Sequence, residues 1–239
     1  MMKPTHLLAF LLTFASLLHA QTNPSTQPSL PAPTAPLPPN LTKIFDGKSL
    51  DGWAQLPADS WIVRDNILAS VGLDRGVIFT KESYDRYRIV FDVRHVAGNK
   101  DHRAGVLVFC TPPAENEKPL DALGGIQFQV PNGGHWDYRK GHNNGGNEVF
   151  TRLVNPKFDE HQWSRVEILV DPATGTARMA VAQPPGSKAV EVLDFKDPTA
   201  GRKGPFALQM HNRGLFDEYA NIAIELNPTG DELITTKEK

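Results

Sequence analysis

The chain has 239 residues, with 25 Lys and Arg against 27 Asp and Glu and a formal net charge of −2. Acids and bases are interspersed, so the sequence lacks the basic stripe of a nucleic-acid-binding surface and the block of like charge typical of polyanion or membrane-surface binding. The single cysteine, Cys110, excludes an intramolecular disulfide. We expect a buried thiol there and stability that comes from an apolar core.

The first 20 residues have the pattern of a secretory signal peptide. Lys3 supplies the positive charge, residues 7–18 supply a short apolar run, and Ala20 offers a small residue for cleavage. The apolar run is too short and too interrupted for a transmembrane span. We therefore predict a protein that is secreted or periplasmic after cleavage near Ala20.

Composition divides the rest of the chain into three parts. Residues 21–40 contain seven prolines among Ser, Thr, Ala and Gln, which predicts an extended, solvated linker. Residues 41–228 have the composition of one globular domain. Residues 229–239 are polar and charged, and we expect a frayed tail.

Short apolar or alternating segments, separated by turn signals, recur along residues 41–228 and predict strands instead of long helices. A tight hairpin is expected where Asp65-Asn66 joins residues 61–63 to residues 67–69. Further strands are expected at 76–80, 87–96, 104–110, 126–130, 163–170, 176–182, 188–193, 206–211 and 219–226. The pattern predicts a single all-β domain, either a β-sandwich or a barrel.

Two of these strands carry neutral polar side chains on one face and apolar side chains on the other. The polar members are Gln127, Gln129, Gln209 and His211. Amides and an imidazole at fixed positions suit a polyhydroxylated ligand such as a sugar better than an ion or a nucleic acid. The alternative is an ordinary solvated sheet face.

A long loop follows the first of these strands, at residues 131–156. Loops of this length in a compact domain are often functional, and an aromatic ring can stack on the apolar face of a pyranose. We therefore include His135, Trp136 and Tyr138 among the candidate substrate-binding residues. The alternative is that the two aromatic rings only pin the loop to the domain.

A metal site built from His135, His142 and Glu148 is a further alternative for this loop. These residues lack the close spacing of known metal motifs. We therefore predict neither a metal nor another cofactor.

Residues 45–53, Phe-Asp-Gly-Lys-Ser-Leu-Asp-Gly-Trp, resemble the opening signature of the 3-keto-disaccharide hydrolase domain. Similar blocks follow at 61–68, 76–93, 103–106, 125–132, 162–164, 204–211 and 221–222. The resemblance covers roughly residues 41–226. It implies a concanavalin A-like jelly-roll sandwich that acts on glycosides whose C3 hydroxyl has been oxidised to a ketone.

Two positions depart from the family pattern. Gln127 stands where the family often has an acidic residue, and Ala220 stands where it often has an arginine. The Gln-x-His element is kept as Gln209 and His211. Three functions therefore stay open: an enzyme that cleaves 3-keto-glycosides, a non-catalytic carbohydrate-binding or adhesion module, and a scaffold domain that binds another protein.

Ordinary glycoside hydrolysis needs two flanking carboxylates, and Gln127 cannot transfer a proton. A 3-keto sugar is easier to cleave, because the ketone acidifies the C2 proton and one base can start an elimination. We expect His211 as the base and Arg103 as the donor to the enolate oxygen, with Gln127 and Gln129 orienting hydroxyl groups. The alternatives are a structural histidine and an arginine paired with Asp101.

Overall fold

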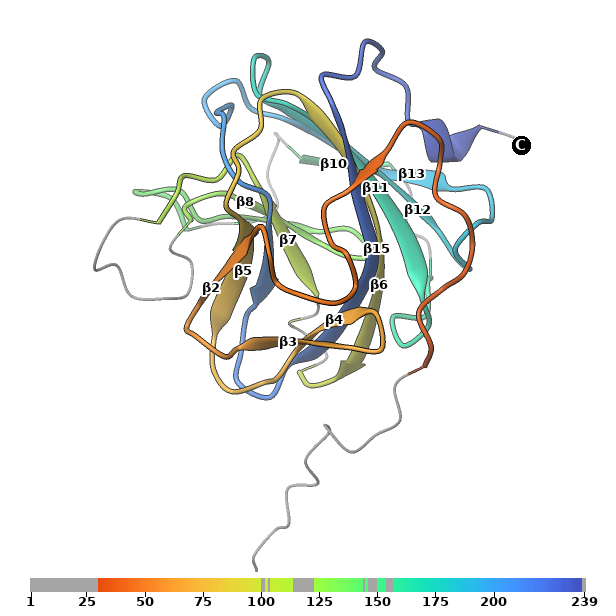
Figure 1. Ribbon diagram of the computed structural model, residues 1–239. Coiled ribbons are helices and arrows are strands. Elements are labelled where there is room, and N and C mark those ends of the chain that lie inside the picture. The colour runs from red at the N-terminus through yellow and green to blue at the C-terminus, as the bar shows by residue number, and fades with distance from the viewer. Residues whose placement is uncertain are drawn as a thin grey trace, which may run out of the picture.

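The protein folds into two antiparallel β-sheets that pack face to face (Figure 1). The computed structural model describes residues 30–99, 102, 104–113, 123–143, 145, 150–153 and 157–237. The expected signal peptide, residues 1–20, lies outside the described residues, as does the first part of the Pro-rich segment. The two sheets confirm the all-β class.

The larger sheet has nine strands, and all its pairs are antiparallel. Its order is β10 (Phe150–Arg152), β13 (Val190–Lys196), β12 (Thr176–Ala182), β11 (Ser164–Asp171), β6 (Tyr87–Ala97), β15 (Phe216–Leu226), β4 (Ile67–Ser70) and β3 (Trp61–Arg64), with β1 (Thr42–Lys43) pairing on β15. The smaller sheet has six strands. Its order is β2 (Trp53–Leu56), β5 (Gly76–Thr80), β14 (Ala207–Met210), β7 (Gly105–Val108), β8 (Ile126–Gln129) and β9 (His135–Asp137).

The core lies between the two sheets. The ring of Phe91 on β6 and the ring of Phe206, which precedes β14, have centroids 5.9 Å apart and join the layers. Side chains alternate between the two faces along each strand, so the apolar side chains of both sheets face inward and form this core. Trp53 and Trp61 are buried in this core as well.

The predicted hairpin between β3 and β4 is confirmed. Asp65 and Asn66 have φ angles of 50° and 63°, and Trp61 pairs with Ser70 at the far end of the two strands. Two successive positive φ angles are typical of a type I′ turn, whose twist matches that of the flanking strands. The turn sequence therefore sets the register of this hairpin.

The long segment 131–156 is partly strand instead of loop. Residues 135–137 form β9, the edge of the six-stranded sheet, and residues 150–152 form β10, the edge of the nine-stranded sheet. Trp136 therefore lies in an edge strand, whereas the sequence had placed it in a loop.

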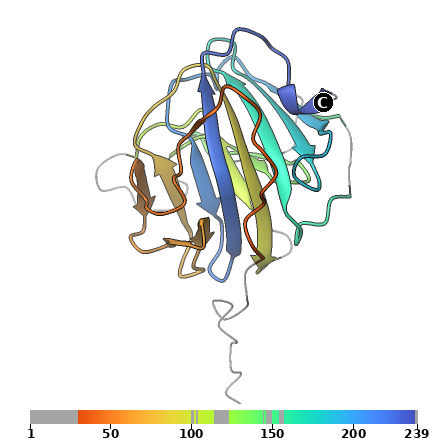
Figure 2. The same cartoon turned by 45° about the vertical axis from the view of Figure 1, so that its right-hand side comes forward.

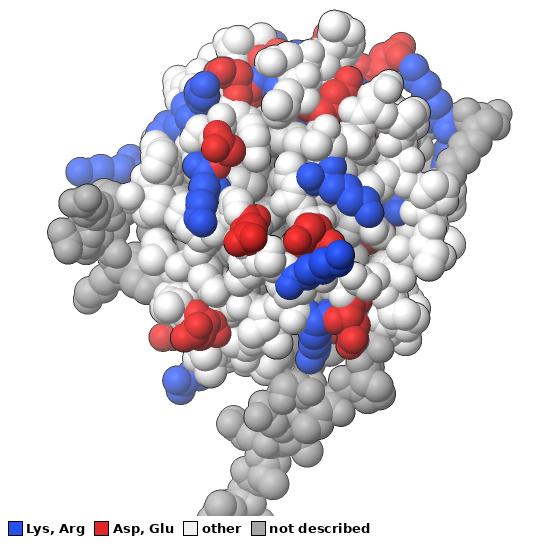
Figure 3. Space-filling model, viewed as in Figure 1, with Lys and Arg blue, Asp and Glu red and all other residues white. Residues whose placement is uncertain are grey.

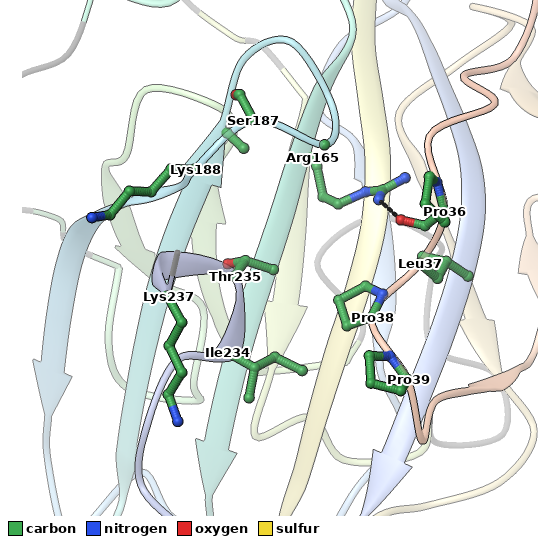
Figure 4. Close-up of a pocket in the computed structure, with 12 residues that line it drawn as sticks. Pro36, Leu37, Pro38, Pro39, Arg165, Ser187, Lys188, Ile234, Thr235 and Lys237 are labelled. Carbon is green, nitrogen blue, oxygen red and sulfur yellow. Dashed lines mark hydrogen bonds between the residues drawn. The ribbon is translucent and has the colours of Figure 1, made fainter. Parts of the chain in front are cut away.

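Residues 30–40, which we call the N-terminal arm, run across the outer face of the nine-stranded sheet (Figure 2). Asn221 Nδ2 donates to the Pro33 carbonyl at 2.8 Å, and Arg165 Nη2 donates to the Ala35 carbonyl at 2.9 Å. Arg165 also donates to the carbonyl of Pro36 (Figure 4). The expectation of a solvated linker is wrong for this part, because its backbone carbonyls are anchored to the sheet.

The described part of the tail is also held on this face. A 3-10 turn, η2 (Ile234–Thr236), follows Leu233, which is buried. The carboxylate of Glu167 accepts hydrogen bonds from the backbone nitrogens of Ile234 at 2.9 Å and Thr235 at 2.8 Å. Residues 229–237 are therefore docked, and the expected fraying is not seen there. A cavity of about 540 Å³ lies between the turn and the arm (Figure 4).

The surface carries no large area of one charge sign on the side seen in Figure 3, where acidic and basic side chains alternate. Part of the charge is buried in pairs on the outer face of the nine-stranded sheet. Arg165 Nε lies 2.8 Å from Asp92, and Arg88 Nε lies 2.8 Å from Glu167. Within the described ranges, no helix has the length and apolar character needed to cross a membrane.

Candidate functional site

The outer face of the six-stranded sheet gathers the amides expected from the sequence. Gln209 on β14 is opposite Gly105 on β7, and Gly105 is in turn opposite Gln129 on β8. In the next row, Gln127 is opposite Trp136 on β9. We call the surface formed by Gln127, Gln129 and Gln209 the amide face.

Two glycines make room for these amides. A Cβ atom at Gly105 would lie 2.8 Å from Gln127 Nε2, so the amide of Gln127 lies over this glycine. A Cβ atom at Gly134 would lie 2.8 Å from Gln129 Oε1. Distances under 3.0 Å are not found for real Cβ atoms, so glycine at each position permits the close approach.

The amides differ in exposure to solvent. Gln209 is fully buried, Gln127 is 4% exposed, and Gln129 is half-buried. The alternative of an ordinary solvated face is therefore wrong for Gln127 and Gln209. Away from bulk water, their hydrogen bonds are electrostatically stronger, so these two amides are held in fixed orientations, and Gln129 is the amide of this face that solvent reaches.

His211 directly follows β14 and meets Tyr138, which directly follows β9. The Tyr138 hydroxyl lies 3.0 Å from His211 Nδ1, and both side chains are half-buried. Burial lowers the pKa of His211 to about 4, helped by the charges of Arg75 and His102. The imidazole is therefore neutral throughout the physiological pH range.

A second histidine, His102, lies against His211 and was not found by the sequence reasoning. The two ring centroids are 4.2 Å apart. Asn212 Nδ2 lies 2.6 Å from His102 Nδ1 and donates to it. His102 belongs to no alternating strand, so no periodic pattern in the sequence points to it.

Trp136 provides an exposed aromatic surface beside the amides. Its side chain is 39% exposed, and its Nε1 donates to Asn143 Oδ1 at 3.0 Å. The centroid of its ring lies 6.4 Å from that of Tyr138. Two rings beside a row of amides are a combination that fits a pyranose, which has both apolar faces and hydroxyl groups.

A charged clamp fixes the segment that carries these rings. Arg139 Nη2 lies 2.7 Å from Asp137 and 2.6 Å from Asp197, and Nη1 donates to Thr199 at 2.9 Å. Burial opposes ionisation of Asp137, but hydrogen bonds from Arg139 hold the pKa of that carboxyl below its usual value. The segment that carries the two aromatic residues, from Trp136 to Arg139, is thus tied to the turn that follows β13.

His135 does not lie on the amide face, which corrects the sequence prediction. It pairs with Phe128, whose side chain is in the core, and its ring centroid is 5.7 Å from that of Phe195. The strand alternation explains this position, since His135 and Trp136 are neighbours and point to opposite sides of the sheet. Burial lowers the pKa of His135.

Several other candidates lie outside the described residues, namely Arg103, Glu148 and Asp101. His142 Nδ1 lies 3.3 Å from Asp137, so this histidine extends the charged clamp. In the parts of the chain that the structure describes, no group of three or more His, Cys, Asp or Glu side chains is arranged to hold a metal ion.

Comparison with known proteins gives one family match. The profile of the 3-keto-alpha-glucoside-1,2-lyase-like domain, the 3-keto-disaccharide hydrolase family, matches residues 40–225. Among curated proteins, no sequence matches.

Solved structures share the fold at low sequence identity. A putative glycosyl hydrolase from Parabacteroides distasonis has a TM-score of 0.56 and 15% identity, over 79% of this chain and 95% of its own. The carbohydrate-binding module CBM66 from Bacillus subtilis has a TM-score of 0.53 and 13% identity, over 73% and 95%. The GH43 protein BlXynB from Bacillus licheniformis has a TM-score of 0.52 and 9% identity, over 79% and 39%. These similarities confirm the jelly-roll sandwich.

Proposed function

The chain belongs to the 3-keto-alpha-glucoside-1,2-lyase-like domain family, and on that premise we propose that its amide face binds a 3-keto-glycoside and cleaves it by elimination. The observation that carries the proposal is the contact between His211 and Tyr138 beside the buried amides. It unites a group able to accept a proton, aromatic rings and neutral hydrogen-bonding groups on one surface.

The proposed reaction begins at C2 of the oxidised sugar. The C3 ketone makes the C2 proton acidic, and Nε2 of His211 removes it, since Nδ1 is engaged by Tyr138. The electron pair moves to the C3 oxygen as an enolate and then expels the group on C1. Addition of water to the resulting double bond gives net hydrolysis.

The remaining residues are proposed to bind and orient the sugar. The accessible amide of Gln129 hydrogen-bonds to hydroxyl groups, the buried amides of Gln127 and Gln209 support that face from within, and Trp136 stacks on the apolar face of the ring. Arg103 keeps its proposed role as donor to the enolate oxygen, which rests on its place in the sequence two residues before Gly105 on β7.

A non-catalytic carbohydrate-binding module is the second candidate. Gln127 supports it, because a carboxamide at this position cannot act as an acid or a base. The similarity of fold to CBM66, which is named a carbohydrate-binding module, is in keeping with it. In this case the same amide face would bind an intact saccharide without cleaving it.

One experiment separates the two candidates. The full chain is incubated with 3-keto-trehalose or methyl 3-keto-glucoside, and release of the C1 group is followed together with binding. We expect turnover by the wild type and its loss in His211→Ala, with binding retained. Saccharide binding without turnover would establish the module, and undiminished turnover by His211→Ala would contradict the assignment of the base.

We also propose that the chain is exported, with a signal peptide at residues 1–20 followed by a Pro-rich segment to residue 40. The basis is the positive, apolar and small-residue pattern that ends at Ala20. Mass spectrometry of the protein recovered outside the cytoplasm is expected to show a new N-terminus near residue 21. An intact Met1 on that material would contradict cleavage.

A further inference from the structure

The hydrogen bond between Tyr138 and His211 joins two groups that each can carry a proton. The Tyr138 hydroxyl oxygen and His211 Nδ1 are 3.0 Å apart, within ordinary hydrogen-bonding distance. An imidazole has two ring nitrogens, and a proton bound at one can be matched by a proton released from the other. In this pair, His211 can take up a proton at Nε2 and release the proton on Nδ1 to the phenol oxygen of Tyr138.

The surroundings of His211 disfavour the doubly protonated ring. The side chain is half-buried, the ring of His102 lies against it at 4.2 Å, and the charge of Arg75 repels a positive imidazolium. His102 is held in place by the side chain of Asn212. When a proton arrives at Nε2, the ring therefore gives up the proton on Nδ1, which has an acceptor at 3.0 Å.

The geometry points to Tyr138 as the catalytic acid of the elimination, which protonates the departing C1 oxygen and is recharged by His211. This inference rests on the proposed function and extends it to a residue whose role was expected to be sugar binding. Before the reaction, Nδ1–H of His211 donates to the phenol oxygen and Nε2 holds the lone pair.

The proposed step balances in protons and electrons. The C2–H bond breaks and its proton bonds to Nε2, while the electron pair becomes the enolate. The enolate collapses to the ketone, the C1–C2 double bond forms and the C1–O bond breaks. The leaving oxygen takes the proton of Tyr138, and Tyr138 takes the proton of Nδ1.

Hydration returns the pair to its starting state. A water oxygen bonds to C1 and its proton passes to Tyr138. Tyr138 gives its own proton to Nδ1, and the proton on Nε2 goes to C2. The two half-reactions together consume one water and leave both side chains as they began, so the cycle needs no oxidant or reductant.

The test uses the Tyr138→Phe variant of the full chain and two substrates that differ only in the leaving group. A methanol leaving group needs protonation, whereas 4-nitrophenolate leaves without it. We expect Tyr138→Phe to lower kcat on methyl 3-keto-glucoside by about 100-fold or more, and to change kcat on the 4-nitrophenyl glycoside by less than about threefold. Equal loss on both substrates, or no loss on the methyl glycoside, overturns the inference.

The controls separate this inference from the proposed function. Tyr84→Phe removes a hydroxyl from a half-buried tyrosine whose ring packs on Tyr87, and it is expected to leave both rates unchanged. If the wild type cleaves neither substrate, the proposed function fails and the inference with it.

If Tyr138→Phe does not fold, a series of aryl 3-keto-glucosides is used with the wild type alone. Weak dependence of kcat on the acidity of the leaving group then supports an acid, and strong dependence overturns it.

Discussion

The side chain of Gln127 lies over Gly105, so closely that a Cβ atom at the glycine would come within 2.8 Å of the amide nitrogen. The backbone of Gly105 has no positive φ angle. The need for glycine is therefore steric, and it concerns the placement of one amide on the amide face.

We predict that Gly105→Ala displaces the amide of Gln127 and weakens ligand binding. The affinity for a 3-keto-glucoside is expected to fall about tenfold, which corresponds to roughly 1.4 kcal/mol. Isothermal titration calorimetry measures this loss. The matched control is Gly230→Ala, where no atom lies within 4 Å of the added Cβ. Equal affinities for the two variants would show that the position of Gln127 does not matter for binding.

A second prediction concerns the charged clamp. Arg139→Gln removes the cation between Asp137 and Asp197, which are separated by 60 residues in the chain, and leaves Asp137 buried without it. We expect the free energy of unfolding to fall by about 1–3 kcal/mol, measured by urea denaturation.

The control for the clamp is an exposed ion pair. Lys203 and Asp85 are 3.3 Å apart, but their side chains are 59% and 64% exposed. Lys203→Ala is therefore expected to change the free energy of unfolding by less than about 0.5 kcal/mol. A loss for Arg139→Gln that is no larger than this would mean that the clamp does not hold the segment.

The third prediction is a dependence of stability on pH. The folded state lowers the pKa of His211 from its ordinary value of 6.5 to about 4. The unfolded chain therefore binds a proton at this residue between those two values while the folded chain does not, so stability is lost as the pH falls from about 6.5 towards 4.

The size of this effect is about 1–2 kcal/mol, because solvent around the half-buried ring screens part of the charge. Urea denaturation of the wild type and of His211→Gln between pH 7 and pH 4 isolates it. The wild type is expected to lose more stability than the variant over this range. Parallel curves would show that the pKa of His211 is not lowered in the folded protein.

The fourth prediction concerns the attachment of the N-terminal arm. Arg165→Met leaves Asp92, which is fully buried, without its cation and removes the donor to the carbonyl of Ala35. The expected cost is about 3 kcal/mol, measured by urea denaturation. The double variant Asp92→Asn, Arg165→Met is expected to recover part of it. No recovery would mean that the arm contact, and not the buried charge, dominates the effect.

Strand alternation in the sequence accounts for much of what the structure shows. It placed Gln127, Gln129, Gln209 and His211 on one side of their strands, and the Asp65-Asn66 turn marked the first hairpin. These features depend on residues close together in the chain. Alternation also explains why His135 does not lie on the amide face. His135 and Trp136 are neighbours in a strand, so their side chains face opposite sides of the sheet.

Other features depend on contacts that the sequence does not display. The clamp joins Arg139 to Asp197, and no local pattern links the two. The N-terminal arm is held through the backbone carbonyls of Pro33 and Ala35. Because every residue has a backbone carbonyl, these contacts leave no mark on the amino-acid composition, and the proline-rich composition alone suggested a solvated linker. Contacts of this kind are set by the packing of the finished sandwich.

The N-terminal arm and the amide face lie on opposite faces of the sandwich. The arm lies on the outer face of the nine-stranded sheet (Figure 2), whereas Gln127, Gln129 and Gln209 belong to strands of the other sheet and lie on its outer face. The segment of residues 30–40 therefore occupies the back of the sandwich. The opposite sheet keeps its outer face clear of this segment, so the arm does not obstruct the proposed ligand of the amide face.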